Sequence, residues 1–333
     1  MVRRDVHHRT LGTIDAVSEI GYGSWEIGSD WGDVSSAEAQ QAVETARKSG
    51  IDFFDTADVY GDGRSERILG DVLREDIDSS AVTVGTKAGR RLDPHTTEGY
   101  TEANLRQFVD RSRENLGVEA LDLLQLHCPP TDVYYQPSVF DALDTLRDEG
   151  RIDRYGVSVE RVEEGLKAIT YPGVESVQII FNPFRQRPAE LFFEEAAARD
   201  VGVIVRVPLA SGLLTGTLSR ETEFPENDHR NYNREGEAFD VGETFAGVPY
   251  EAGLDAVDAL TEHVPADLSV AQFSLRWILD HEAVSTVIPG STTPEHIRAN
   301  AAVSDLDPLG VDAHEAVDAV YQKYVREHVH HRW

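Results

Sequence analysis

Phe53-Phe54-Asp55-Thr56-Ala57-Asp58-Val59-Tyr60-Gly61 is a short apolar, β-prone run that passes into a polar turn. Helical patterns flank it. Before it, Ser35 and Glu38 form a capping box that opens the helix predicted over residues 35–49. After it, Ser65–Glu75 carries apolar residues at helical spacing. The segment is therefore predicted to be one strand of a repeating β/α unit.

The same alternation continues along the whole chain. Eight apolar runs are predicted as strands: Ser18–Tyr22, Asp52–Thr56, Ala81–Thr86, Asp122–His127, Arg154–Val159, Val174–Phe181, Val201–Val207 and Val284–Pro289. Helices are predicted over 35–49, 65–75, 101–116, 138–149, 160–169, 188–200, 268–281 and 294–304. Eight strands that alternate with helices predict an α/β fold, a closed parallel (β/α)8 TIM barrel.

The spacing of these units is regular except after the seventh strand. Residues 213–265 form a long loop insertion there, whose length suggests a functional lid. A further helix, 312–328, follows the barrel. No shift in composition divides the chain, so we expect a single barrel domain over residues 1–333.

The charge balance excludes one class of partner. Lys and Arg number 31 against 60 Asp and Glu, so the net charge is −29, and phosphate backbones need a basic surface. We therefore expect no nucleic-acid partner. One cysteine excludes an internal disulfide, and no apolar run reaches the roughly 18 residues that span a bilayer. The basic segment 1–10 leads into no apolar run, so we expect a cytoplasmic protein without membrane attachment.

Lysine is scarce, since only four of the 31 basic residues are Lys. A large acid excess with little Lys is similar to proteins adapted to concentrated salt, where screening removes the self-repulsion of the charge. The acids of the insertion are interpreted as a solvated face rather than a metal site: Glu221, Glu223, Glu226, Asp228, Glu235, Glu237, Asp240 and Glu243. No metal site is expected.

Polar residues end three consecutive predicted strands. Asp55 ends the second, Lys87 the third and His127 the fourth, and Tyr60 follows Asp55 in the loop. Catalytic groups of such barrels lie at the carboxyl ends of strands, and neighbouring strands are about 4.8 Å apart. We expect these four side chains to meet at the mouth. Asp55 with Lys87 alone fits a structural ion pair, and His127 alone fits a core histidine; the set of four favours an active site.

The grouping suits acid catalysis on a carbonyl. A free Tyr has a pKa near 10, and a neighbouring cation lowers it. Lys87, held by Asp55, is expected to lower the pKa of Tyr60 and make it a proton donor near neutrality. His127 is expected to orient a carbonyl oxygen.

Motifs along the chain resemble the aldo-keto reductase family over essentially its whole length. The matching segments are 53–57, 60–61, 65–66, 69–70, 86–87, 126–127, 156–158, Gln178, 208–216 and 288–291. The resemblance implies an NAD(P)H-dependent oxidoreductase that reduces an aldehyde or ketone to an alcohol. It implies that Tyr60 is the general acid, that Asp55 and Lys87 tune it, and that His127 positions the substrate.

The resemblance also implies a cofactor site and a substrate wall. Ser158 and Gln178 would bind the carboxamide. The pyrophosphate would lie against the segment 209–216 after strand seven, with Pro208, Leu209, Ser211, Gly212, Leu214 and Gly216 as its binding residues. The adenosine end would be surrounded by Gly290, Ser291, Thr292, His296 and Asn300. Trp25 would line the substrate pocket. Asn300 lies six residues after Pro294, whose helix N-terminus suits a phosphate.

Two departures from the family pattern lie near the nicotinamide end. Val159 stands where an Asn usually follows the Ser, so one carboxamide contact is lost. Arg206 stands where a Tyr often stacks on the nicotinamide ring. A guanidinium stacks as a plane but adds charge, which suits a phosphate or an acidic substrate as well.

Two further departures lie at the adenosine end. Gly290 and His296 replace a Lys and an Arg that often grip the 2′-phosphate of NADP. Ser291, Thr292 and Arg298 are left as groups for that phosphate. NADP(H) is the favoured cofactor, with NAD(H) as the alternative.

Two other functions compete with carbonyl reduction. Some members of the family are cofactor-binding regulatory subunits of membrane channels with vestigial turnover. A Schiff-base lyase with Lys87 as nucleophile is the third possible function, but such an enzyme would not need Tyr60 and Asp55 in this arrangement.

Overall fold

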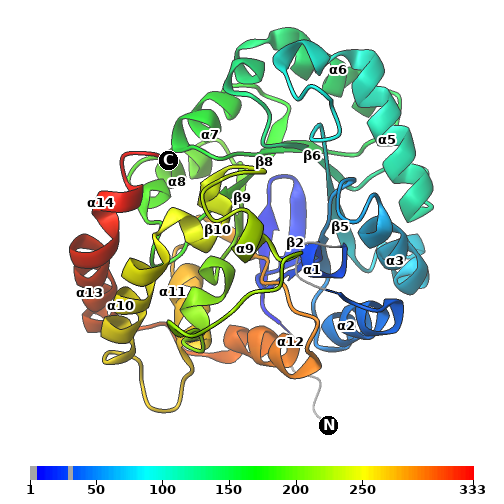
Figure 1. The fold of residues 1–333 in the computed structure, drawn as a ribbon. Coiled ribbons are helices and arrows are strands. Elements are labelled where there is room, and N and C mark those ends of the chain that lie inside the picture. The colour runs from blue at the N-terminus through cyan, green and yellow to red at the C-terminus, as the bar shows by residue number, and fades with distance from the viewer. Residues whose placement is uncertain (1–5, 29–32) are drawn as a thin grey trace.

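A sheet of eight parallel strands curves into a nearly closed barrel in the computed structural model, which describes residues 6–28 and 33–333 (Figure 1). The strands are β3 (Tyr22–Gly23), β4 (Phe53–Asp55), β5 (Thr83–Ala88), β6 (Leu123–His127), β7 (Tyr155–Ser158), β8 (Val174–Ile180), β9 (Gly202–Arg206) and β10 (Val284–Val287). They pair in chain order, and isolated parallel bridges from Ile20 to Val287 and from Gly23 to Gly290 join the two edges. The predicted (β/α)8 barrel is confirmed.

Helices surround the sheet (Figure 1). They are α1 (Trp25–Gly28), α2 (Ser36–Lys48), α3 (Arg64–Val72), α4 (Arg74–Asp78), α5 (Glu102–Leu116), α6 (Pro137–Asp148), α7 (Val162–Ala168), α8 (Phe192–Ala197), α9 (His229–Tyr232), α10 (Tyr250–Thr261), α11 (Val270–Leu279), α12 (Pro294–Ala301), α13 (Val311–Val320) and α14 (Arg326–Val329). The predicted capping box is present, because the Ser35 hydroxyl accepts from the Glu38 amide and the Glu38 carboxylate accepts from the Ser35 amide.

An antiparallel hairpin precedes the barrel and was not predicted. It consists of β1 (His8–Leu11) and β2 (Ile14–Ser18), joined by a turn at Gly12 with φ +58°. The prediction of a barrel strand over Ser18–Tyr22 is therefore wrong in its start, because Ser18 ends the hairpin. Leu11 and Val17 pack against Phe53 inside the barrel. The hairpin thus closes the amino end of the barrel.

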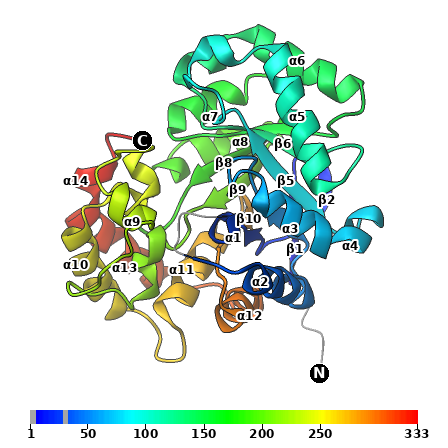
Figure 2. The ribbon, with the colours of Figure 1, turned by 45° about the vertical axis from the view of Figure 1, so that its right-hand side comes forward.

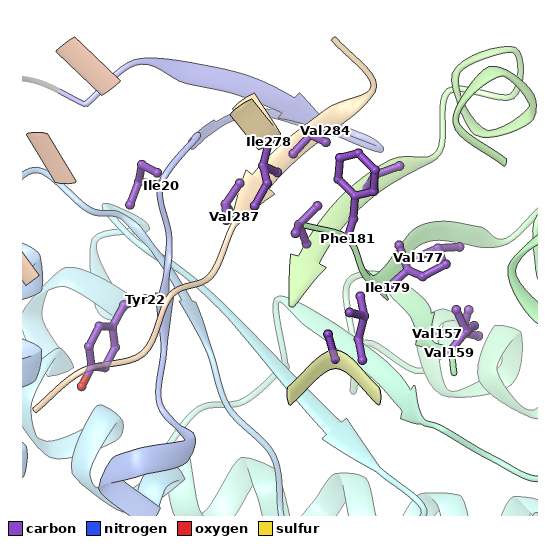
Figure 3. Close-up of a cluster of buried hydrophobic side chains, with 14 of the residues drawn as sticks. Ile20, Tyr22, Val157, Val159, Val177, Ile179, Phe181, Ile278, Val284 and Val287 are labelled. Atoms are coloured by element: carbon purple, nitrogen blue, oxygen red, sulfur yellow. The ribbon is translucent and has the colours of Figure 1, made fainter. Parts of the chain in front are cut away.

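A continuous apolar core separates the sheet from the helices. Figure 3 shows Val177, Ile179 and Phe181 of the β8 region near Val284 of β10 and Ile278 of α11. All five are almost fully buried. Each such side chain contributes roughly 1.5–3 kcal/mol when it leaves water, so this layer fixes the position of the strands that end at the mouth.

The insertion after β9 is only partly a loop. Residues 217–248, called the strap below, hold α9, whereas Tyr250–Thr261 forms the helix α10. Leu254, Val257 and Leu260 of α10 are buried, and α10 lies beside α13 in both views (Figures 1 and 2). The predicted extra helix after the barrel thus supports the insertion. Among the described residues, no helix has the length and apolar character that a membrane crossing requires.

Candidate active site

Strand geometry turns three polar side chains toward the mouth. Residues two apart on a strand share a face, and Phe53 and Leu123 face the barrel interior. Asp55 therefore faces inward with Phe53, and His127 faces inward with Leu123. Asp55 is level with Gly85 of the next strand, which places Lys87 one layer further toward the mouth.

Lys87 connects Asp55 and Tyr60, two of the other three members of the predicted tetrad. Its Nζ atom donates to Oδ2 of Asp55 at 2.5 Å, to the Thr56 carbonyl at 2.8 Å and to the Tyr60 hydroxyl at 3.3 Å. The rings of Tyr60 and His127 meet edge to face, with centroids 5.9 Å apart. The structure thus brings all four predicted catalytic residues together.

Burial and charge set the protonation of Lys87 and Tyr60. Burial lowers the pKa of Lys87, but Asp55 and Tyr60 more than offset this and raise it, so the amine stays an ammonium. A permanent ammonium argues against a Schiff-base nucleophile. Burial raises the pKa of Tyr60, and Lys87 opposes that rise without reversing it. The expected lowering of the Tyr60 pKa is therefore wrong for the free protein, because desolvation of the phenolate outweighs the cation.

His127 is held as a neutral imidazole. Burial lowers its pKa well below the usual range, and the cations Arg90 and Lys87 lower it further. Its Nδ1 atom is buried without a hydrogen-bond partner among the described residues. The side chain lines the cavity beside Tyr60. A neutral imidazole with one N–H can donate to a carbonyl oxygen placed there.

A cavity of about 530 Å³ extends from Tyr60 and His127 to Asn300 on α12. Of the predicted cofactor residues, these line it: Gln178, Arg206, Pro208, Leu209, Ser211, Gly212, Gly290, Ser291, Thr292, His296 and Asn300. Ser158, Leu214 and Gly216 are not among the lining residues. Ser158 is fully buried with its hydroxyl 3.6 Å from the Cys128 sulfur, Leu214 is fully buried, and Gly216 lies against Val270.

Gln178 is tied to the tetrad in the free protein. Its Nε2 amide donates to Oδ1 of Asp55 at 2.7 Å, while its side chain lines the cavity. Because Oδ2 of the same carboxylate binds Lys87, Gln178 fixes the orientation of Asp55. The amide expected to hold the carboxamide thus also positions the ion pair.

The adenosine-end residues lie in the segment just before α12 and along that helix. Thr293 precedes Pro294 and makes no side-chain capping bond, and its amide donates to the Ser291 hydroxyl at 3.1 Å. Arg298, expected as a phosphate group, is not among the lining residues: it pairs with Glu295 at 3.3 Å and is 59% exposed. His296 is the basic residue of α12 that faces the cavity.

Aromatic side chains form the wall next to Tyr60. The Trp25 ring is stacked on the Tyr60 ring, at a centroid distance of 6.1 Å and an angle of 19°. His229 and Phe239 of the strap meet Trp25 at 4.7 and 5.9 Å. Trp25 lies where the resemblance placed it, and the strap completes the wall over it.

The solvated-face interpretation of the strap acids is wrong at two positions. Asp228 and Glu243 are buried, at 1% and 6% exposure. Asp228 pairs with Arg230, while Glu243 pairs with Arg90 and lies 3.6 Å from Arg206. Glu243 also lines the cavity, as does Glu26 after β3, whose pKa burial raises to about 7. Neither acid could be assigned to the site from the sequence, because the groups that surround each of them are distant along the chain.

One group of potential metal ligands adjoins this region. Ligand atoms of Cys128, Glu160 and Glu243 lie within 4.8 Å of one another. The guanidinium groups of Arg90 and Arg206 already neutralise these acids. Two fixed cations at this point oppose the binding of a metal cation.

Residues 19–322 match the model of the aldo/keto reductase family, so the chain belongs to that family. It is similar to the uncharacterized oxidoreductase YqkF of Bacillus subtilis, with 30% identity over 301 residues that cover 88% of this chain and 89% of the relative. It is also similar to an NADH-specific methylglyoxal reductase of Escherichia coli, with 26% identity over 91% and 95% of the two chains. The expectation of an aldo-keto reductase enzyme is confirmed.

Solved structures agree with the fold. The holo form of the aldo-keto reductase AKR11C1 from Bacillus halodurans superposes with a TM-score of 0.73 at 25% identity, covering 95% of this chain and 96% of that one. The glycerol dehydrogenase AKR11B4 from Gluconobacter oxydans gives 0.74 at 25% identity and 97% coverage of both chains. A nicotinamide dinucleotide is the cofactor class of this enzyme, and the cavity lining fits it. Ser291, Thr292 and Asn300 of the α12 region line the cavity together with Asp55, Tyr60 and His127 of the tetrad, and Gly212 and Gly290 of the lining have no side chain that would fill the space.

Proposed function

We propose that this enzyme reduces an aldehyde or ketone to an alcohol with NADP(H) as the favoured cofactor and NAD(H) as the alternative. The observation that carries the proposal is the position of the Lys87 ammonium, which contacts both the Asp55 carboxylate and the Tyr60 hydroxyl at the edge of the cavity. When bound, the nicotinamide supplies a hydride to the carbonyl carbon.

The residues of the chain manage the proton and the orientation. Tyr60 donates its hydroxyl proton to the carbonyl oxygen, and its O–H bond breaks as the new O–H bond of the alcohol forms. The Lys87 ammonium stabilises the resulting phenolate, and Asp55 holds that ammonium in place. His127 donates a hydrogen bond to the same oxygen and so fixes the carbonyl beside Tyr60. Trp25 and the strap keep water from the reacting atoms.

The remaining residues would hold the cofactor. Gln178 would bind the carboxamide, the segment 208–212 would lie along the pyrophosphate, and the first turn of α12 would take the adenosine phosphate. Gly290 lacks a side chain and Arg298 is paired with Glu295, so the side chains of this end that line the cavity and support NADP(H) over NAD(H) are those of Ser291, Thr292 and His296. Titration with both dinucleotides decides the order of preference.

The test of the proposal is the loss of NADPH or NADH absorbance with a reactive aldehyde such as a nitrobenzaldehyde. Tyr60→Phe is expected to lower turnover by about 10²- to 10⁴-fold while cofactor fluorescence titration stays unchanged. Tyr135→Phe, at a residue that is 64% exposed, is the matched control and should keep full rate. Full turnover in Tyr60→Phe would remove the acid role from this residue.

A second candidate is a regulatory subunit with vestigial turnover. The chain is 26% identical, over 88% of its length, to a probable voltage-gated potassium channel subunit beta of Arabidopsis thaliana. The intact tetrad favours the enzyme. Tight cofactor retention, negligible multiple turnover and a co-purifying partner would favour the subunit.

We further propose a cytoplasmic, salt-adapted protein that folds as one domain over residues 1–333, does not bind nucleic acid and acts on a small carbonyl or alcohol. The charge of −29 supports the salt adaptation and the lack of nucleic-acid binding. The continuous sheet and core support the single domain.

A further inference from the structure

A cluster of buried charges lies at the catalytic end of the cavity. Glu243 of the strap accepts from Arg90, which follows β5, and lies 3.6 Å from Arg206 at the end of β9. Glu160 lies 3.5 Å from Arg90 and is not among the residues that line the cavity. The side chains of Glu243 and Arg206 are 7% and 9% exposed. Solvent therefore screens these charges only weakly.

The backbone holds Glu243 in place. The Ser211 hydroxyl donates to the Glu243 carbonyl at 3.1 Å and accepts from the Phe245 amide at 3.1 Å. Burial opposes ionisation of Glu243, but Arg90 and Arg206 lower its pKa to about 2. It is a fixed negative charge at neutral pH.

The Glu243 charge reaches the tetrad, because it opposes ionisation of Tyr60 and so helps to raise the pKa of that phenol. Glu243, Arg206, Tyr60 and His127 all line the same cavity. A carbonyl that takes a proton from Tyr60 must also lie about 3–3.5 Å from the carbon of the nicotinamide that reacts with it. The nicotinamide ring therefore has to bind within the field of the Glu243–Arg206 pair.

The two forms of the cofactor differ in that field. The reduced nicotinamide ring is neutral and the oxidised ring is a cation. Two guanidinium groups oppose the cation, and Glu243 is the carboxylate of the cluster that faces the cavity. If the negative charge of Glu243 is removed, the oxidised cofactor binds more weakly and the reduced cofactor does not.

We propose that Glu243 is a specificity-determining residue for the oxidation state of the nicotinamide: its carboxylate balances Arg90 and Arg206 so that this site can hold the oxidised cofactor. The inference rests on the proposed function. A unit charge acting over about 8 Å at an effective dielectric constant of about 20 corresponds to roughly thirty-fold in binding.

The experiment measures binding rather than turnover. Wild type, Glu243→Gln, Glu243→Asp and Glu237→Gln are titrated with NADP⁺ and NADPH by calorimetry, and the ratio of the two dissociation constants is compared. Glu243→Gln is expected to raise the oxidised-to-reduced ratio by at least about tenfold. Glu243→Asp keeps the charge and Glu237→Gln removes an exposed strap acid, so both should keep the wild-type ratio. A loosened strap would weaken both forms together and leave the ratio unchanged.

Arg206→Gln keeps the test decisive if Glu243→Gln fails to fold. It removes a cation, so the same ratio should fall below that of wild type, and the double variant should return toward the wild-type value. An unchanged ratio in variants that bind both forms overturns the inference alone. Failure of wild type to bind either form overturns the proposed function, and this inference with it.

Discussion

The Nζ atom of Lys87 lies 3.3 Å from the hydroxyl oxygen of Tyr60, and the same atom donates to Asp55 at 2.5 Å. The carboxylate, ammonium and phenol therefore form one chain of hydrogen bonds at the ends of two strands and in the loop after the first of them. The ammonium has two roles. It neutralises the buried Asp55 carboxylate, and it stabilises the negative charge that Tyr60 acquires when it gives up its proton.

Lys87→Met, alone and combined with Asp55→Asn, should distinguish the catalytic role of the ammonium from its role in stability. Loss of the ammonium is expected to lower turnover by at least about 100-fold and the free energy of unfolding by about 3–5 kcal/mol, because Asp55 is left buried and unpaired. Adding Asp55→Asn should restore part of the stability and none of the turnover. Urea unfolding and the nitrobenzaldehyde assay measure the two effects, with Lys48→Met as an exposed control. Equal stability of the single and double variants would contradict the pairing argument.

His127 predicts how stability depends on pH. An imidazole in the unfolded chain takes up a proton near pH 6.5, whereas burial and the cation Arg90 hold the pKa of His127 well below that value. Below pH 6.5 the unfolded state binds the extra proton, so stability falls as the pH falls, by up to about 1.4 kcal/mol per pH unit.

His127→Asn should remove this contribution. The drop in unfolding free energy between pH 7.5 and pH 5.5 is expected to be smaller in the variant than in wild type, and His296→Asn, at an exposed position, should keep the wild-type drop. An identical drop in all three proteins would mean that His127 takes up its proton in the folded state as readily as in the unfolded chain.

The four tetrad residues could be predicted because each is tied to a strand end that the sequence marks clearly. Asp55 follows two aromatic residues, and Lys87 and His127 each end a run of β-prone residues. Parallel strands then bring these ends together without further information. The pKa of Tyr60 could not be predicted in the same way, because its direction depends on how completely the ring is buried.

Glu243 shows why other parts of the site were missed. It lies in a polar segment rich in acids, and its partner Arg90 is 153 residues away. No local pattern distinguishes a buried acid from solvated neighbours when the pairing cation comes from another loop. The hairpin β1–β2 was missed for a related reason. Leu11 and Val17 are buried only because the hairpin packs against the amino end of the barrel, and the local sequence does not show that contact.

Salt should stabilise the protein strongly. With a net charge of −29, repulsion between surface acids opposes the folded state in dilute buffer, and screening relieves it. The melting temperature is expected to rise from dilute buffer to molar KCl, by about 1–2 °C for each kcal/mol gained in a chain of this length. Equal melting temperatures in dilute buffer and molar KCl would exclude salt adaptation.

Contacts with Trp333 should stabilise the strap. Its ring lies 4.1 Å from the Arg185 guanidinium, and its Nε1 donates to Asp240 at 2.9 Å. A side chain on Gly242 or Gly247 would collide with this ring, so the contact is close. Trp333→Ala is expected to speed proteolytic cleavage within 217–248, located by mass spectrometry, and to weaken cofactor binding; Tyr135→Ala is the exposed control. Unchanged cleavage would show that the strap is held without Trp333.

The support of α10 by α13, and of the strap by Trp333, also has a consequence for biosynthesis. All eight strands of the barrel leave the ribosome before residues 311–333 do, so a nascent chain can complete its sheet while one wall of its cavity is still without support. We expect such a chain to resist unfolding before it can retain a dinucleotide. The ability to bind the dinucleotide would then arise after the barrel has folded, as a separate stage of maturation.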